Sequence, residues 1–146
     1  MYLGLKHAHS GLRWLVLFFL VWAIVNAFQK RKSATEFTAK DKRPTLLALI
    51  TTHIQLLLGL VLYFISPLVS FKEGFMKETV TRFYTVEHLT LMILAIILIT
   101  VGYSRAKRKT DPKAKFNSVF TFYLIGLLLI LIAIPWPFRN LGAAWF

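Results

Sequence analysis

The sequence predicts an all-α integral membrane protein built as a bundle of four spanning helices. Apolar residues make up 57% of the 146-residue chain, above the roughly 45–50% of a soluble domain. They fall in four blocks that short polar segments separate. Each block approaches the roughly 20 residues that a helix needs to cross a bilayer. We therefore expect a single transmembrane domain over residues 1–146.

The spans are expected at about 3–28, 45–66, 84–103 and 118–136. Pro44 suits the first turn of the second span, and Pro67 stops that span. The fourth span ends at the Pro135-Trp136-Pro137 break. The first apolar block is too long for a signal peptide, and no small-x-small cleavage site follows it, so we expect this span to be retained.

Basic residues predict how the helices are oriented. Segments 29–44 and 104–117 carry six Lys or Arg each, whereas segment 67–83 carries three. Short loops rich in Lys and Arg stay on the cytoplasmic side. Since short connections make consecutive helices antiparallel, the sequence predicts an up-down-up-down bundle with both termini on the outer side.

Charge and missing motifs exclude several classes of function. The net charge of +12 does not indicate nucleic acid, because the charges flank the apolar blocks as they do in membrane proteins. The absence of cysteine excludes disulfides, thiolate zinc sites, iron–sulfur ligation and c-type haem attachment. There is no phosphate-binding glycine loop and no H-E-x-x-H zinc motif. The only aspartates, Asp41 and Asp111, lie in the basic loops, where they cannot complete a hydrolytic triad in the membrane.

The histidines are the candidate cofactor ligands. All four lie in or at the end of an expected span: His7, His9, His53 and His88. Ionisable side chains are costly in a membrane, and neutral imidazole is a common ligand of haem iron, zinc and copper. A helix rises 1.5 Å per residue, so the height of each histidine above the basic end of its span can be counted. This height is about 28 Å for His9, about 23 Å for His88 and about 12 Å for His53, with a register error of about 3–6 Å. We therefore expect His9 and His88, on helices that face each other across the bundle, to hold haem iron axially.

Arg13 lies four residues after His9 and so on the same face of the first helix. A guanidinium there suits a haem propionate, which it can bind through two parallel hydrogen bonds. Two alternatives stay open for Arg13: an interaction with the outer membrane surface, and neutralisation of Glu87. Glu87 itself is expected to cap the third helix.

The other two histidines, His53 and His7, have structural roles as alternatives to ligand binding. His53 either ligates a different centre, hydrogen-bonds to Gln55 or a backbone carbonyl, or lies nearer His88 than the register implies. His7 lies two residues from His9 and points elsewhere, so we expect a solvated interfacial residue. A copper or other metal site near His7 and His9 is a further alternative. Three glycines are expected to mark close helix packing: Gly59, Gly102 and Gly126.

Four stretches carry a family resemblance over essentially the whole chain: HAHSGLRW at 7–14, HIQLLLGLVLY at 53–63, RFYTVEH at 82–88 and IPWPF at 134–138. They resemble small bacterial four-helix membrane proteins labelled "cytochrome b". The resemblance implies a bacterial inner-membrane protein that binds haem b, with His9, His53 and His88 as its marked histidines. A looser similarity links the chain to a four-helix half of haem A synthase, which holds haem between histidines on alternate helices.

We expect a b-type cytochrome-like protein that transfers electrons in or near a respiratory chain. Electron transfer is expected rather than catalysis. Its expected partners are membrane lipid, subunits of a respiratory complex or a quinone, and a second copy of the chain, but no nucleic acid. The main alternative is a cofactor-free accessory or assembly subunit of a membrane complex, in which the histidines are interhelical hydrogen-bond partners.

Overall fold

The computed structural model describes residues 1–33, 35–143 and 145. Within these residues the chain is all-helical and has no strand. Four helical stretches are long and apolar enough to cross a membrane, which confirms the expected all-α class and the four long apolar helices. The elements are α1 (Tyr2–Lys30), α2 (Ala39–Ile65), η1 (Phe75–Lys77), α3 (Thr79–Arg82), η2 (Phe83–Glu87), α4 (His88–Arg108), α5 (Pro112–Ala133) and η3 (Pro137–Arg139). The third stretch runs from α3 through η2 to α4.

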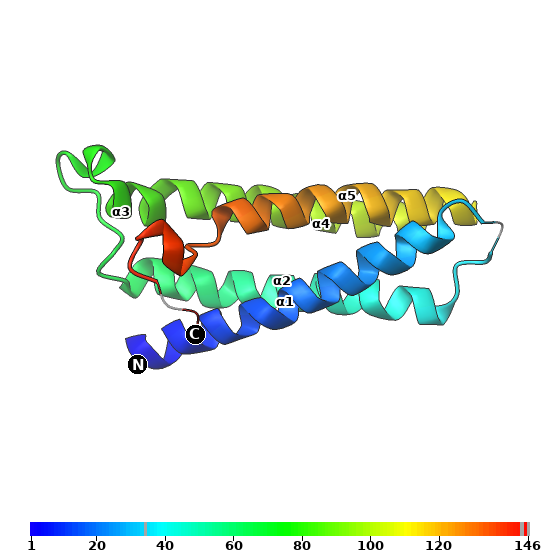
Figure 1. Cartoon of the computed structure of the whole chain (residues 1–146), viewed down its shortest axis with the longest axis horizontal. Helices are drawn as coiled ribbons and strands as arrows, with labels where there is room; N and C mark the ends of the chain where they lie inside the picture. The colour runs from blue at the N-terminus through cyan, green and yellow to red at the C-terminus, as the bar shows by residue number, and fades with distance from the viewer. Residues whose placement is uncertain (34, 144, 146) are drawn as a thin grey trace.

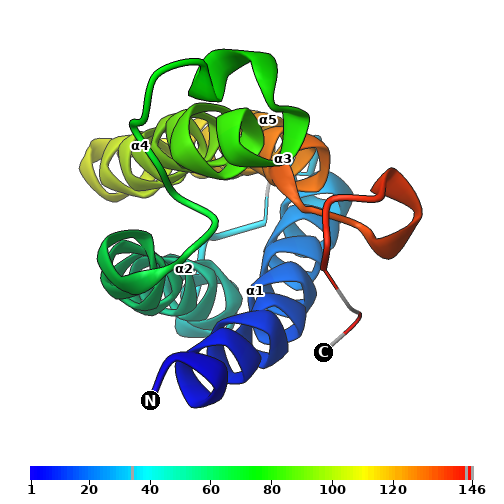
Figure 2. The same cartoon turned by 90° about the vertical axis from the view of Figure 1, so that its left-hand side faces the viewer.

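The long helices lie side by side along the long axis of the molecule (Figure 1). Both chain ends lie at one end of the bundle, and the connection between α1 and α2 lies at the other. Seen from the end that holds the termini, α1 and α2 form one pair, and α4 and α5 form another (Figure 2). Helix α1 also packs against α5, whereas α2 and α4 make far less contact. The bundle is therefore tight around α5 and more open between α2 and α4.

Two glycines let α4 and α5 approach closely. A Cβ atom at Gly102 would lie 2.5 Å from the Cβ atom of Phe122, and one at Gly126 would lie 2.8 Å from Cγ1 of Ile99. No side chain fits at such distances, so the helices touch backbone to side chain, as they often do in membranes. This contact confirms the expectation of close packing at both positions.

Helix ends differ from the expected spans because polar residues extend the helices past the apolar blocks. Helix α2 begins at Ala39, so Pro44 lies inside the helix and not in its first turn. Helix α5 begins at Pro112, where the Asp111 side chain accepts a hydrogen bond from Ala114 N at 2.9 Å. The third stretch begins at Thr79 and contains the π-helical turn η2. Hydropathy locates the apolar stretch, whereas capping residues locate the helix end.

The expectation that Glu87 caps the third helix is wrong. The helix has already begun at Thr79, two turns earlier. Glu87 instead accepts a hydrogen bond from Nε of Arg82 at 2.7 Å. The π-helical turn lies between these two residues, and both side chains stay partly exposed.

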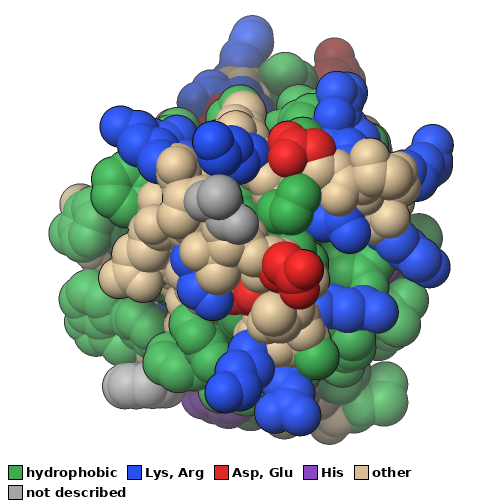
Figure 3. Space-filling view, turned by 90° about the vertical axis from the view of Figure 1, so that its right-hand side faces the viewer, with side chains coloured by type: hydrophobic (Ala, Val, Ile, Leu, Met, Phe, Trp, Pro, Cys, Tyr) green, Lys and Arg blue, Asp and Glu red, His purple; other side chains and the backbone are tan. Residues whose placement is uncertain are grey.

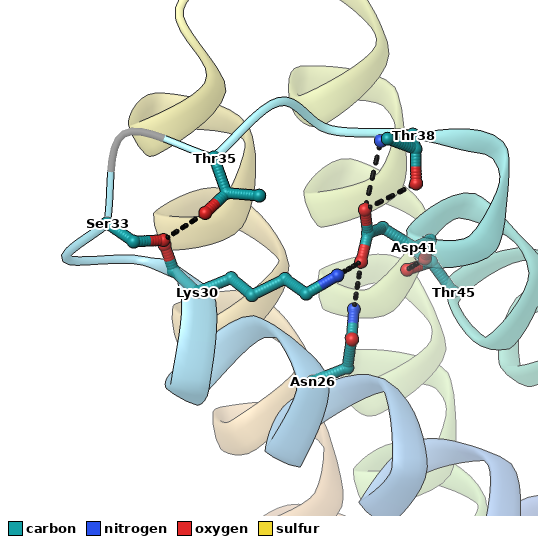
Figure 4. A network of polar contacts seen from close by, with 7 residues as sticks. All are labelled: Asn26, Lys30, Ser33, Thr35, Thr38, Asp41 and Thr45. Carbon is teal, nitrogen blue, oxygen red and sulfur yellow. Dashed lines mark hydrogen bonds and ion pairs between the residues drawn. The ribbon is translucent and has the colours of Figure 1, made fainter.

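A buried carboxylate joins α1 to α2 at the basic end of the bundle (Figure 4). Asp41 is fully buried. It accepts hydrogen bonds from Nζ of Lys30 at 2.5 Å, from Nδ2 of Asn26 at 2.9 Å, and from the backbone N and Oγ1 of Thr38 at 2.9 Å each. These donors come from α1 and from the residue before α2, so this one side chain fixes how the two helices meet.

We expect the substitution Asp41→Asn to lower the free energy of unfolding by about 3 kcal/mol, because the amide cannot accept from all of these donors and leaves the ammonium without a counter-charge. The matched control is Asp111→Asn, where the capping side chain is exposed and Asn caps equally well, so about zero change is expected. Reversible unfolding of the full chain in detergent micelles measures both. Equal stability of the two variants would contradict the role of Asp41.

Candidate cofactor-binding site

A cavity lies between the two helix pairs in the half of the bundle that holds the termini. Helices α1, α2, α4 and the end of α5 line it, and its volume is about 1260 Å³ including the space at its open side. Most of its lining is apolar, as in ligand sites generally. The side chains that bring nitrogen to it are Lys6, His9, Arg13, Gln55 and His88.

His9 and His88 face each other in this cavity from α1 and α4. Their ring centroids lie 6.4 Å apart, with the ring planes 68° from each other. A metal-to-nitrogen bond of about 2.0 Å on each side, together with the distance of about 1.1 Å from each nitrogen to its ring centre, requires a separation of about 6 Å. The structure thus brings together the two histidines that the depth estimate paired, at a separation that one metal atom between them would require.

The His88 ring has a defined tautomer. Its Nδ1 lies 2.8 Å from the carbonyl oxygen of Ala133, near the end of α5. A carbonyl only accepts, so Nδ1 donates its proton and Nε2 of the neutral ring keeps its lone pair. The rings of Phe83 and Tyr84 flank the imidazole at 5.8 and 6.4 Å between centroids. Such a partner on the second nitrogen is the usual support of a metal-binding histidine.

His9 has a buried ring nitrogen that is not satisfied. Its Nδ1 has no hydrogen-bond partner among the described residues. The side chain of Gln55 donates from Nε2 to the His9 backbone oxygen at 2.8 Å. Oε1 of the same amide is also buried and has no partner among the described residues. Buried polar atoms without partners are costly and need an explanation, of which a bound group is one.

Gly59 makes room for the His9 ring. A Cβ atom at position 59 would lie 3.1 Å from Cε1 and 3.7 Å from Nδ1 of His9. The close packing expected at Gly59 is thus a contact between α2 and the His9 imidazole. The sequence does not show that this glycine contributes to the site. The smallest residue allows α2 to pass directly beside the ring.

Hydrogen bonds join the π-helical turn that precedes His88 to α2 and to the loop after α2. Tyr63 on α2 donates its hydroxyl proton to the backbone oxygen of Thr85 at 3.0 Å. The Thr85 hydroxyl accepts from Ser70 N at 3.1 Å and donates to Ser70 O at 3.3 Å. These bonds hold an irregular turn, of a kind found frequently at functional sites. The sequence does not reveal the turn, because its composition is that of an ordinary helix.

Arg13 lies in the cavity wall, only 7% exposed. Its Nη2 donates to the backbone oxygen of Trp145 at 2.6 Å, and its guanidinium lies 5.3 and 5.9 Å from the ring centroids of Trp14 and Trp136. The guanidinium is buried, and Glu87 pairs with Arg82 among the described residues. Nε of Arg13 is buried without a partner among the described residues, so the guanidinium keeps one N–H donor that can bind a ligand.

The structure does not bring the other two histidines into the cavity. His53 lies on α2 with Nδ1 2.8 Å from Leu49 O, which matches the backbone-carbonyl alternative, and with Nε2 3.4 Å from Oγ1 of Thr100 on α4. His7 is exposed. Within the described residues no group of three or more His, Cys, Asp or Glu is placed to hold a metal ion. The cavity therefore offers two imidazoles, a set that suits a group which supplies its remaining ligands itself.

Comparison of the chain with known protein families, with curated protein sequences and with solved structures finds no match. The function of this site is therefore argued from its own side chains.

We expect Gly59→Ala to lower the free energy of unfolding by about 1 kcal/mol, because the added methyl group presses on the His9 ring. In the His9→Ala background the ring is gone, so the same substitution should instead raise the free energy of unfolding by up to about 1 kcal/mol, because alanine is the better helix former. A double-mutant cycle on the full chain in detergent measures this coupling. Additive effects, within about 0.5 kcal/mol, would show that the two residues do not press on each other.

Proposed function

We propose that this chain is a membrane b-type cytochrome that holds haem b non-covalently between His9 and His88 and transfers single electrons in or near the respiratory chain of a bacterial inner membrane. The observation that carries the proposal is the pair of facing imidazoles, 6.4 Å apart on two helices. Cofactor sites in helical bundles are built in this way, from side chains on facing helices.

Three further observations fit a haem. Nδ1 of His9 is buried without a partner, so rotation of this ring toward a metal breaks no hydrogen bond to the described residues. Gly59 leaves space beside the ring that a Cβ atom would take. Arg13 lines the same cavity with a spare donor, as a propionate partner would. His53 lies outside this set and remains the alternative ligand.

The residues of the site favour electron transfer over catalysis. Haem, when bound, supplies an iron atom that changes oxidation state by one electron. His9 and His88 would both serve as ligands of the iron, which leaves neither imidazole to act on a substrate. Most of the cavity wall is apolar, and Ala133 O fixes the orientation of the His88 ring.

We also propose the up-down-up-down topology with both termini on the periplasmic side. The two termini lie at one end of the bundle (Figure 1). Twelve Lys and Arg lie in 29–44 and 104–117, against three acidic residues. Lys and Arg side chains are spread over the opposite end face, among few Asp and Glu side chains (Figure 3). This distribution is typical of a cytoplasmic end, so in the proposed orientation the haem would lie in the outer half of the membrane.

We expect the protein purified from membranes to show a Soret band, with sharpened α and β bands after reduction, and to contain haem b by the pyridine haemochrome assay. His88→Ala and His9→Ala should each weaken haem binding by at least about tenfold, because each removes an axial ligand. The matched controls are His7→Ala and His53→Ala, which should keep the haem content of the wild type.

A colourless, metal-free preparation that co-purifies with other membrane subunits would overturn the cytochrome proposal and favour the accessory subunit. Metal without a Soret band would favour a small metal-binding protein. Full haem content in His88→Ala, with an unchanged spectrum, would refute the assignment of the ligand.

The lack of cysteine makes the topology directly testable. We expect a single cysteine at Glu73, in the exposed loop after α2, to react with an impermeant maleimide added outside intact spheroplasts. A single cysteine at Thr110, between α4 and α5, should react only after permeabilisation. The reverse labelling pattern would show that the termini lie on the cytoplasmic side and would contradict the proposed topology.

A further inference from the structure

A second cavity lies at the basic end, away from the cavity that holds His9 and His88. The residues before and at the start of α2, the end of α4 and the start of α5 form it, and its volume is about 800 Å³ including its open side. Its wall carries three lysines from these three places: Lys42, Lys107 and Lys115. The rest of the wall includes the aromatic rings of Phe37 and Tyr103.

The three ammonium groups have no counter-charge within the described part of the chain. The ion pairs found there join Lys30 to Asp41 and Arg82 to Glu87. Asp41 lies next to Lys42 in the sequence, but its oxygens already accept from Lys30, Asn26 and Thr38. Three positive charges around one hollow repel each other unless an anion lies between them.

The surroundings favour an amphiphilic anion over a free ion. The helices that form this cavity continue into the membrane with large apolar side chains exposed, Ile50 on α2, and Ile97 and Val101 on α4. The contact between α2 and α4 is sparse, so their apolar surfaces stay accessible along the bundle. A molecule with an anionic head and apolar tails would match both the cavity and these surfaces. Basic pockets between spanning helices bind lipid headgroups by this combination.

We infer that this cavity is a specific binding site for an anionic phospholipid, whose headgroup phosphate lies among Lys42, Lys107 and Lys115 and whose acyl chains lie on the apolar surface of α2 and α4. Phe37 and Tyr103 would border the glycerol region, where aromatic side chains are favoured. The site is independent of the haem proposal, because no lining residue is shared between the two cavities.

The test measures binding of short-chain phosphatidylglycerol to the full-length protein in a non-ionic detergent by titration calorimetry, with short-chain phosphatidylcholine and inorganic phosphate as the other arms. We expect the triple variant Lys42→Gln, Lys107→Gln, Lys115→Gln to bind phosphatidylglycerol at least about tenfold more weakly, since each ammonium contributes roughly a fivefold factor near an anionic group. The corresponding triple Lys→Arg variant should keep the wild-type affinity, because it preserves the charges.

The matched control removes three exposed lysines of the same end that do not line the cavity: Lys32, Lys40 and Lys113. It changes the net charge equally, so a specific site predicts less than a twofold loss. Equal losses in the two Gln triples would overturn the inference in favour of diffuse attraction. Equal affinity for phosphatidylcholine, or for inorganic phosphate, would also overturn it.

Thermal unfolding followed by circular dichroism shows whether each variant keeps its fold. If the cavity triple unfolds, Lys107→Gln and Lys113→Gln are compared as single variants, because both side chains are exposed and neither supports the core. A loss confined to Lys107→Gln supports the site, and equal behaviour of the two single variants overturns it.

Discussion

The close contact between α4 and α5 is the interaction on which the rest of the structure depends. Gly102 and Gly126 allow it, because a Cβ atom at either position would overlap a neighbouring side chain. This contact places the end of α5 beside the start of α4, so that Ala133 O can bind Nδ1 of His88. Helix α5 is also packed on α1, whereas the contact between α2 and α4 stays sparse, and residues of both α2 and α4 line each of the two cavities.

The hydrocarbon part of a membrane contains no water that could satisfy a polar group, so each polar atom there needs a partner inside the protein. Most polar side chains of the long helices have such a partner. For example, the hydroxyls of Thr45, Thr52 and Thr100 donate to carbonyls of their own helices. Three of the four exceptions among the described residues gather in one place. Atoms of His9, Arg13 and Gln55 are buried without partners, and all three residues line the cavity between the helix pairs. The fourth exception, Nε of Arg31, lies at the basic end of the bundle, beside the rings of Phe28 and Phe120. This concentration, more than any single contact, is what distinguishes a binding site from ordinary helix packing.

Much of the fold and part of the site could be predicted from the sequence. Hydropathy alone located four spans, and counting rise per residue paired His9 with His88, because both depend on regular helical geometry. Helix ends were missed where a side chain decides them, as Thr38 and Asp41 do for α2. The contact of Gly59 with His9 could not be foreseen, because the rotation of two helices about their axes is set by packing between them. The partner of Arg13 was missed for a similar reason, since it is a backbone carbonyl and leaves no signature in the side-chain sequence.

The π-helical turn at Phe83–Glu87 makes the direction of His88 depend on chain length. A π-helical turn holds one residue more than an α-helical turn, so everything before it is rotated by about 100° relative to a continuous α-helix. Removal of Val86 from this turn would keep every residue that lines the cavity and still turn His88 away from His9, or Thr85 away from Tyr63. Insertions and deletions here should therefore be tolerated far less in evolution than substitutions, and the spacing between Thr79 and His88 is expected to vary less than the residues that fill it.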